Sequence, residues 1–62
     1  MKEFKVCVAS RYMHNDYRYY DIYAVSAKNL ENARMYAKRV ISYWNNKDTN
    51  TMYEVYDIWE EK

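Results

Sequence analysis

Apolar and polar residues alternate in the first half of the chain, and this pattern predicts two strands. From Phe4 to Val8 apolar side chains occupy every second position, and residues 17–27 are dense in Tyr, Ile and Val. Both features are typical of strands, which we place at about 3–13 and 17–27. Because the Asn15-Asp16 pair between them is typical of a turn, the two strands are expected to form a β-hairpin.

The register of this hairpin depends on the length of its turn. A three-residue turn would oppose Val6 to Ala24 and Phe4 to Ser26. We prefer a two-residue turn, because its register places six apolar side chains on one face of the hairpin. The preferred pairs are Val6 with Val25, Val8 with Tyr23 and Phe4 with Ala27.

After the second strand the apolar residues recur at spacings of three and four, which predicts an amphipathic helix over about 30–45. Asn29 is the expected N-cap, and Glu31 is favourably placed in the first turn. The chain has no Gly, so Asn45-Asn46 is expected to supply the left-handed C-cap. The apolar stripe consists of Leu30, Ala33, Ala37, Val40, Ile41 and Trp44.

Residues 51–60 are again rich in strand-forming side chains, so the expected order is strand, strand, helix, strand. Sixty-two residues support one domain, residues 1–62, with a small core. A helix that returns the chain lets the third strand run antiparallel to the first. We therefore predict an α+β fold, a ββαβ domain whose three-stranded antiparallel sheet has the order 2-1-3 and carries the helix on one face. A third strand parallel to the second is the alternative.

One helix covers only one face of such a sheet, and the other face is expected to be an apolar surface. Large exposed apolar patches usually mark interaction sites. For the third strand the faces stay open, because Tyr53, Val55 and Trp59 form a set as apolar as Met52, Tyr56 and Ile58. The expected residues are Lys5, Cys7, Ala9, Arg11, Met13, Arg18, Tyr20, Ile22, Ala24, Ser26, Met52, Glu54, Tyr56 and Ile58.

The net charge of +1 hides an uneven distribution of charge along the chain. Residues 1–47 hold nine Lys or Arg against four acidic residues, whereas residues 48–62 hold one Lys against five acidic residues. The acidic end can keep an edge strand soluble. On the predicted helix a basic strip lies opposite the apolar stripe, and its role stays open. The strip consists of Lys28, Arg34, Lys38, Arg39 and Lys47.

Catalytic and metal-binding functions find little support in the residues. Without Gly there is no phosphate-binding loop, and the single His14 and single Cys7 can form neither a zinc site nor an internal disulfide. We therefore predict no enzyme activity, no cofactor and no metal. No apolar run approaches the roughly 20 residues that span a bilayer, and the N-terminus lacks a signal-peptide pattern, so we expect a cytoplasmic protein without membrane contact.

Protein binding uses the remaining features best. Interface cores favour Tyr, Trp, Met and Arg, and this chain holds nine Tyr, two Trp and four Met. We also consider a homodimer through the open sheet face, because a small core gains from further burial. The alternative function is single-stranded nucleic-acid binding on that face. The candidate binding residues are Arg11, Tyr17, Arg18, Tyr19, Tyr20, Ile22 and Tyr56.

In size and composition the chain resembles the small proteins that bacteriophages encode. It is rich in Tyr, Asn and Lys, whose codons are A/T-rich, and lacks Gly and Pro. The segment from Tyr23 to Ala33 also resembles a strand-to-helix junction of small phage and bacterial domains. The resemblance implies an inhibitor of a host enzyme or antiphage defence protein, which would act in the host cytoplasm. It assigns no functional residues, and it leaves the identity of the host protein open.

Overall fold

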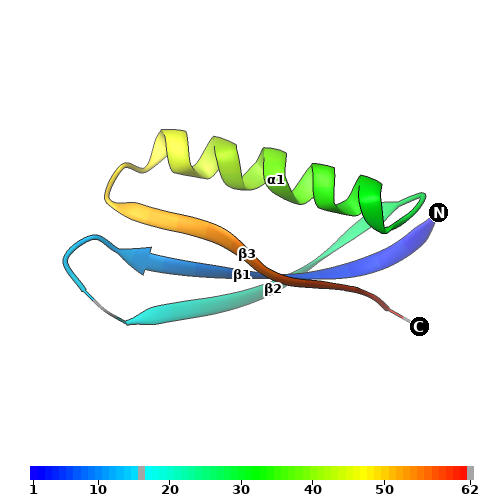
Figure 1. The fold of residues 1–62 in the computed structure, drawn as a ribbon, viewed down its shortest axis with the longest axis horizontal. Coiled ribbons are helices and arrows are strands. Elements are labelled where there is room, and N and C mark those ends of the chain that lie inside the picture. The colour runs from blue at the N-terminus through cyan, green and yellow to red at the C-terminus, as the bar shows by residue number, and fades with distance from the viewer. Residues whose placement is uncertain (16, 62) are drawn as a thin grey trace.

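A long β-hairpin is followed by one helix and a third strand, which returns beside the first. The computed structural model describes residues 1–15 and 17–61. Its three strands form one antiparallel sheet of order β2-β1-β3, and α1 lies along one face (Figure 1). This confirms the predicted ββαβ fold, and the parallel placement of the third strand is wrong. The elements are β1 (Lys2–Tyr12), β2 (Arg18–Ala27), α1 (Leu30–Lys47) and β3 (Thr51–Glu60).

The hairpin register differs by two residues from the preferred prediction, and the three-residue alternative is also wrong. Val6 lies opposite Tyr23, not Val25. The reason is the connection: pairing between β1 and β2 stops at Arg11 and Arg18, so residues 12–17 replace the tight turn. Because a shift of two residues preserves the side-chain alternation, every residue keeps its predicted face. Asp16, half of the predicted turn, lies outside the described residues.

A β-bulge in β3 resolves which side chains of this strand face the helix. Val8 pairs with Val55, but the next residue along, Cys7, pairs with Asp57, so Tyr56 is an extra residue on β3. A bulge of this kind reverses the alternation beyond it. Ile58 therefore packs against the core, and its predicted place on the open face is wrong.

The helix begins as predicted and ends later than predicted. The Asn29 side chain accepts a hydrogen bond from the backbone N–H of Asn32 at 2.8 Å, which confirms the N-cap. The helix continues to Lys47, and its C-cap is Asp48 in an extended conformation. A left-handed cap at Asn45-Asn46 is therefore wrong. Asn45 instead bonds to Tyr53 of β3, since its side chain accepts from the backbone N–H at 2.8 Å and donates to the C=O at 3.0 Å.

The core lies between α1 and the central strand. Val6 and Phe4 are fully buried, and small residues on the helix, Ala33 and Ala37, allow the helix to approach them closely. Leu30, at the end of the predicted stripe, is instead 39% exposed. Partly buried side chains from the outer strands and the helix close the core around these residues. They are Tyr23, Val25, Trp44, Tyr53, Val55 and Ile58.

In the part of the chain that the structure describes, residues 1–15 and 17–61, no helix is apolar enough over a sufficient length to span a membrane. The basic strip of α1, Arg34, Lys38, Arg39 and Lys47, is exposed, as is Lys28 just before the helix. Two of them lie beside the sheet, since Lys38 lines a hollow with Val55 of β3 and Lys47 lines one with Tyr53. The prediction that the strip lies opposite the apolar stripe is therefore wrong for these two residues.

One buried polar atom has no hydrogen-bond partner among the described residues, the hydroxyl of Tyr23. The Tyr23 ring packs edge-on against Trp44, with ring centroids 5.9 Å apart. Burial raises the pKa of this hydroxyl above its usual value, because the ionised phenolate would lose hydration.

We predict that Tyr23→Phe flattens the loss of stability at high pH. Above pH 10 the unfolded chain releases the Tyr23 proton while the folded chain still holds it, so the free energy of unfolding falls as pH rises towards the raised pKa. The variant lacks this contribution and leaves no unpaired hydroxyl, so its stability at pH 7 should be equal or higher, by up to about 1 kcal/mol. Urea unfolding from pH 7 to 11 measures both effects. A steeper loss in the variant would contradict this account of Tyr23.

We predict that Asn45→Ala lowers the free energy of unfolding by about 1 kcal/mol relative to Asn46→Ala. Both substitutions replace an exposed Asn by a better helix former, but only Asn45 bonds to the edge of β3. Chemical denaturation of the two variants gives the difference directly. Equal stabilities would show that the Asn45 bonds to Tyr53 add nothing to the fold.

Candidate protein-binding surface

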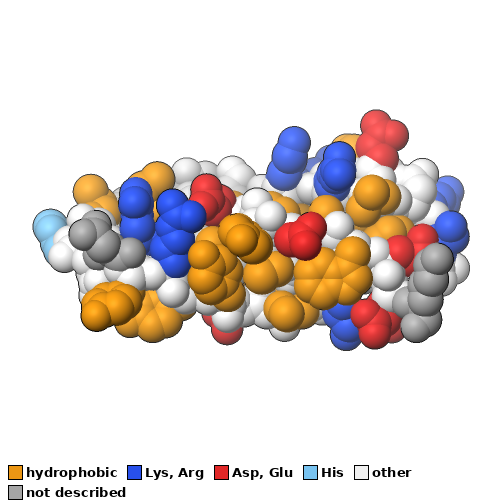
Figure 2. Space-filling view, turned by 60° about the horizontal axis from the view of Figure 1, so that its bottom comes forward, with side chains coloured by type: hydrophobic (Ala, Val, Ile, Leu, Met, Phe, Trp, Pro, Cys, Tyr) orange, Lys and Arg blue, Asp and Glu red, His pale blue; other side chains and the backbone are white. Residues whose placement is uncertain are grey.

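The face of the sheet opposite α1, called here the open face, is covered by no other element formed by residues 1–15 and 17–61. Hydrophobic side chains gather over its middle, a pair of basic ones lies nearer the hairpin end, and acidic ones lie among the hydrophobic ones and towards the other end (Figure 2). Met13, which we expected here, lies beyond the end of β1. From the strand registers, the open face consists of Glu3, Lys5, Cys7, Ala9, Arg11, Arg18, Tyr20, Ile22, Ala24, Ser26, Met52, Glu54, Tyr56, Asp57 and Trp59.

An aromatic pair crosses the central strand at the middle of this face. The rings of Tyr20 and Tyr56 come from the two outer strands and meet edge to face, with centroids 5.0 Å apart and an interplanar angle of 68°. Between these strands lie the small residues Cys7 and Ala9, which are buried although no helix covers them. Small residues on the central strand leave the space in which the two rings approach each other. Tyr56 follows Met52 and Glu54 in the alternation of β3 and so faces the same side as they do.

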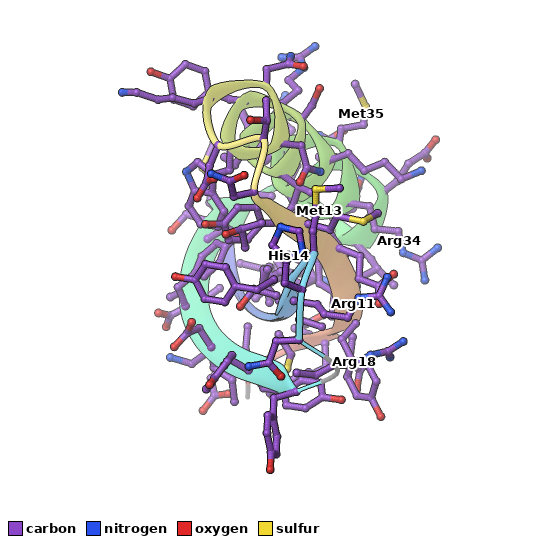
Figure 3. The ribbon with its side chains drawn as sticks, turned by 90° about the vertical axis from the view of Figure 1, so that its left-hand side faces the viewer. Arg11, Met13, His14, Arg18, Arg34 and Met35 are labelled. Atoms are coloured by element: carbon purple, nitrogen blue, oxygen red, sulfur yellow. The ribbon has the colours of Figure 1, made fainter. Side chains whose placement is uncertain are left out.

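Two arginines face each other at the hairpin end of the open face. Arg11 and Arg18 are directly opposite in the register, an arrangement that is unfavourable for like charges. Both side chains extend to the same side of the hairpin, whereas His14 lies at its tip (Figure 3). Glu54 reaches Arg18 at 3.8 Å, but both side chains are exposed, so this ion pair holds them weakly.

A shallow depression of about 80 Å³ lies among these charged groups. Its lining includes Ala9 and Arg11 of the central strand, Arg18 of β2, and Met52 and Glu54 of β3. This shape suits the end of one side chain of a partner, because a volume of this size holds a few atoms.

Five of the seven candidate binding residues lie together on the open face: Arg11, Arg18, Tyr20, Ile22 and Tyr56. Tyr19 does not join them, because it alternates with Tyr20 and lies on the opposite side, beside Asp21 and Tyr53. Tyr17 precedes β2 and is exposed. The sequence analysis missed Trp59, which the bulge moves to the open face. A change of the apolar alternation after Tyr56 is the only signal of this in the sequence.

The two residues that the sequence singled out for their chemistry, Cys7 and His14, lie in different parts of the fold. Cys7 is buried in the central strand, and His14 is exposed in the connection between β1 and β2. Within the part of the chain that the structure describes, no three His, Cys, Asp or Glu side chains gather closely enough to hold a metal ion. The open face presents exposed apolar side chains with charged residues at defined positions among them.

Comparison of the chain with models of protein families, with curated proteins and with solved structures gives no match. The features of this chain that bear on its function are therefore its open face and its sequence.

We predict that the Tyr20–Tyr56 contact stabilises the fold by about 0.5–1.5 kcal/mol beyond the area it buries. The measurement is a double-mutant cycle of Tyr20→Ala, Tyr56→Ala and the double variant, followed by urea unfolding. A cycle of Tyr36 and Tyr56 is the control, because Tyr36 is as exposed as Tyr20 but lies on the helix. The prediction fails if the first cycle gives no coupling energy, and the control cycle should give none.

Proposed function

We propose that this chain is a small non-enzymatic protein-binding module whose open face contacts a partner protein. The observation that carries the proposal is a group of large apolar side chains that stay half or more exposed on one face. Ile22 and Tyr56 are 60% and 61% exposed, and Met52 and Tyr20 are 57% and 50% exposed. A chain with so small a core would gain stability by burying them, so their exposure indicates a use outside the monomer.

The charges of the open face support a specific kind of partner. The apolar middle would bind the centre of an interface, where Tyr, Met and Ile exclude water. At one end the opposed Arg11 and Arg18 lower the stability of the free protein, and a partner carboxylate between them would relieve the repulsion. The proposed partner therefore presents an apolar patch with an acidic residue at its border.

The resemblance to phage proteins suggests a biological role for this binding. Under it, the module inhibits a host enzyme or defence protein in the host cytoplasm by occupying a surface of that protein. The size and composition of the chain support this inhibitor function. The open face is the proposed contact surface whichever host protein is the partner.

A single observation favours the alternative function, single-stranded nucleic-acid binding. Tyr20 and Tyr56 share the open face with Arg11, Arg18 and Lys5, residue types that contact bases and phosphates. Two features of the same face disfavour it. The two rings meet edge to face and so offer no parallel platform for bases, and Glu54 and Asp57 would repel phosphates. We therefore prefer protein binding.

We predict that the double variant Arg18→Ala/Tyr20→Ala binds its partner at least about 30-fold more weakly than the unaltered chain, since both residue types dominate interface energies. The tagged chain is first used to retain a stoichiometric partner from nuclease-treated bacterial lysate, with a wash at about 0.5 M salt to screen exposed charges. Affinity for the purified partner is then measured by calorimetry.

The matched control is Arg34→Ala/Tyr36→Ala on the outer face of α1. It removes the same residue types, and Tyr36 has the same exposure as Tyr20, 50%. Thermal unfolding checks that both double variants fold. Equal affinities of the two variants would contradict the proposed site. Recovery of nucleic acid alone, only when nuclease is omitted and only at low salt, would favour the alternative function.

A further inference from the structure

The two edges of the sheet are protected to very different degrees. β3 forms one edge, and the side chain of Asn45 occupies both the N–H and the C=O of Tyr53 there. A bulge at Tyr56 interrupts the strand, and the acidic residues Glu54, Asp57 and Glu60 lie along it. Each of these features opposes pairing with another strand.

The edge formed by β2 is less protected, since between Arg18 and Ala27 it holds one acidic residue and no bulge. Its pairing with β1 is continuous from Lys2–Ala27 to Arg11–Arg18, without a bulge. From residue 19 to residue 27 the only charged side chain is Asp21, and Tyr, Ile and Val predominate. The backbone of the helix lies nearer to β3 than to β2, so the β2 edge has less cover from it. A regular, long and nearly uncharged edge strand is a template for another strand.

We propose that a second copy of this chain pairs with β2, so that two β2 strands run antiparallel at the centre of a six-stranded sheet. In such a dimer the two-fold axis is perpendicular to the sheet, and both helices lie on the same side. This proposal concerns the edge of the sheet. It does not depend on whether the open face binds a partner protein.

Symmetry restricts the register of the two strands. In an antiparallel pair of identical strands, the numbers of opposed residues have a constant sum. Opposed residues must also lie on the same face and so differ by an even number, which makes this sum even. Each allowed register therefore places one residue, the one at half this sum, opposite its own copy. A register centred on Asp21 opposes two carboxylates, and one centred on Tyr23 opposes Arg18 to Lys28 of the second copy. A register centred on Ile22 avoids both conflicts and pairs residues 18–26 of each copy.

The Ile22-centred register is also complementary in size. It places Tyr20 opposite Ala24 of the second copy and Tyr19 opposite Val25, so that large side chains meet smaller ones. Arg18 lies opposite Ser26, which is uncharged. Charge and size thus favour the same register.

The dimer would leave both open faces on one continuous surface. This distinguishes it from a homodimer through the open face, which we considered from the sequence and which would bury that surface. Two substitutions that introduce a charge distinguish the edge-to-edge dimer from the face-to-face dimer. Ile22→Lys places two ammonium groups beside the two-fold axis, whereas Met52→Lys alters β3 at a similarly exposed position of the open face.

The first test measures mass by sedimentation equilibrium over a range of protein concentrations. We expect the unaltered chain and Met52→Lys to reach twice the monomer mass of 7.7 kDa, and Ile22→Lys to remain at the monomer mass. An unaltered chain that stays monomeric overturns the proposal. So does loss of the dimer in both variants, which would indicate face-to-face association, or its retention in both. Circular dichroism verifies that each variant folds.

The second test fixes the register by disulfide formation in a Cys7→Ala background, because Cys7 lies opposite Ile22 within the monomer. Opposed residues of antiparallel strands have Cα atoms about 5 Å apart, within disulfide range. Ile22→Cys should therefore form a covalent dimer on mild oxidation, and Ala24→Cys, two residues from the axis, should not. Equal cross-linking of both variants, or none at either, overturns the Ile22-centred register.

Discussion

The packing of one helix on the central strand is the interaction on which the rest of this structure depends. Val6 and Phe4 reach full burial because Ala33 and Ala37 on α1 let the helix lie close to the sheet. A chain of this size has material for only one such layer. The opposite face is left without a cover, so every question about function becomes a question about the uncovered surface and the two edges of the sheet.

The bulge lets β3 place apolar side chains both in the core and on the open face. Tyr53, Val55 and Ile58 cannot all face the helix in a regular strand, because Ile58 is an odd number of residues from the other two. The extra residue, Tyr56, reverses the alternation, so Ile58 reaches the core and Tyr56 remains on the open face against Tyr20. The same irregularity weakens β3 as a pairing edge. One local feature thus serves the core, the open face and the edge.

Five of the candidate binding residues could be identified from the sequence because they depend only on alternation. Arg18, Tyr20 and Ile22 share a face in any regular strand, whatever the register. Alternation also places Tyr19 on the other face, since it lies between two members of that set. Trp59 could not be placed, because its face depends on a bulge whose position is chosen by packing against the helix. The Asn45 side chain was read as a local cap, although its hydrogen bonds are made to a distant strand.

The sequence by itself determined the order of the elements, the strand faces of the hairpin, the N-cap at Asn29 and the antiparallel sheet with one helix. These follow from side-chain periodicity and local hydrogen bonding, which act over a few residues. Only the tertiary structure decided the hairpin register, the bulge, the helix end at Lys47 and the difference between the two edges. The bulge and the difference between the edges depend on contacts of β3 with β1 and α1, where several local arrangements are nearly equal and packing selects one. The hairpin register and the helix end depend on how residues 12–17 connect the strands and on the Asn45 bonds to Tyr53, which the local pattern leaves open.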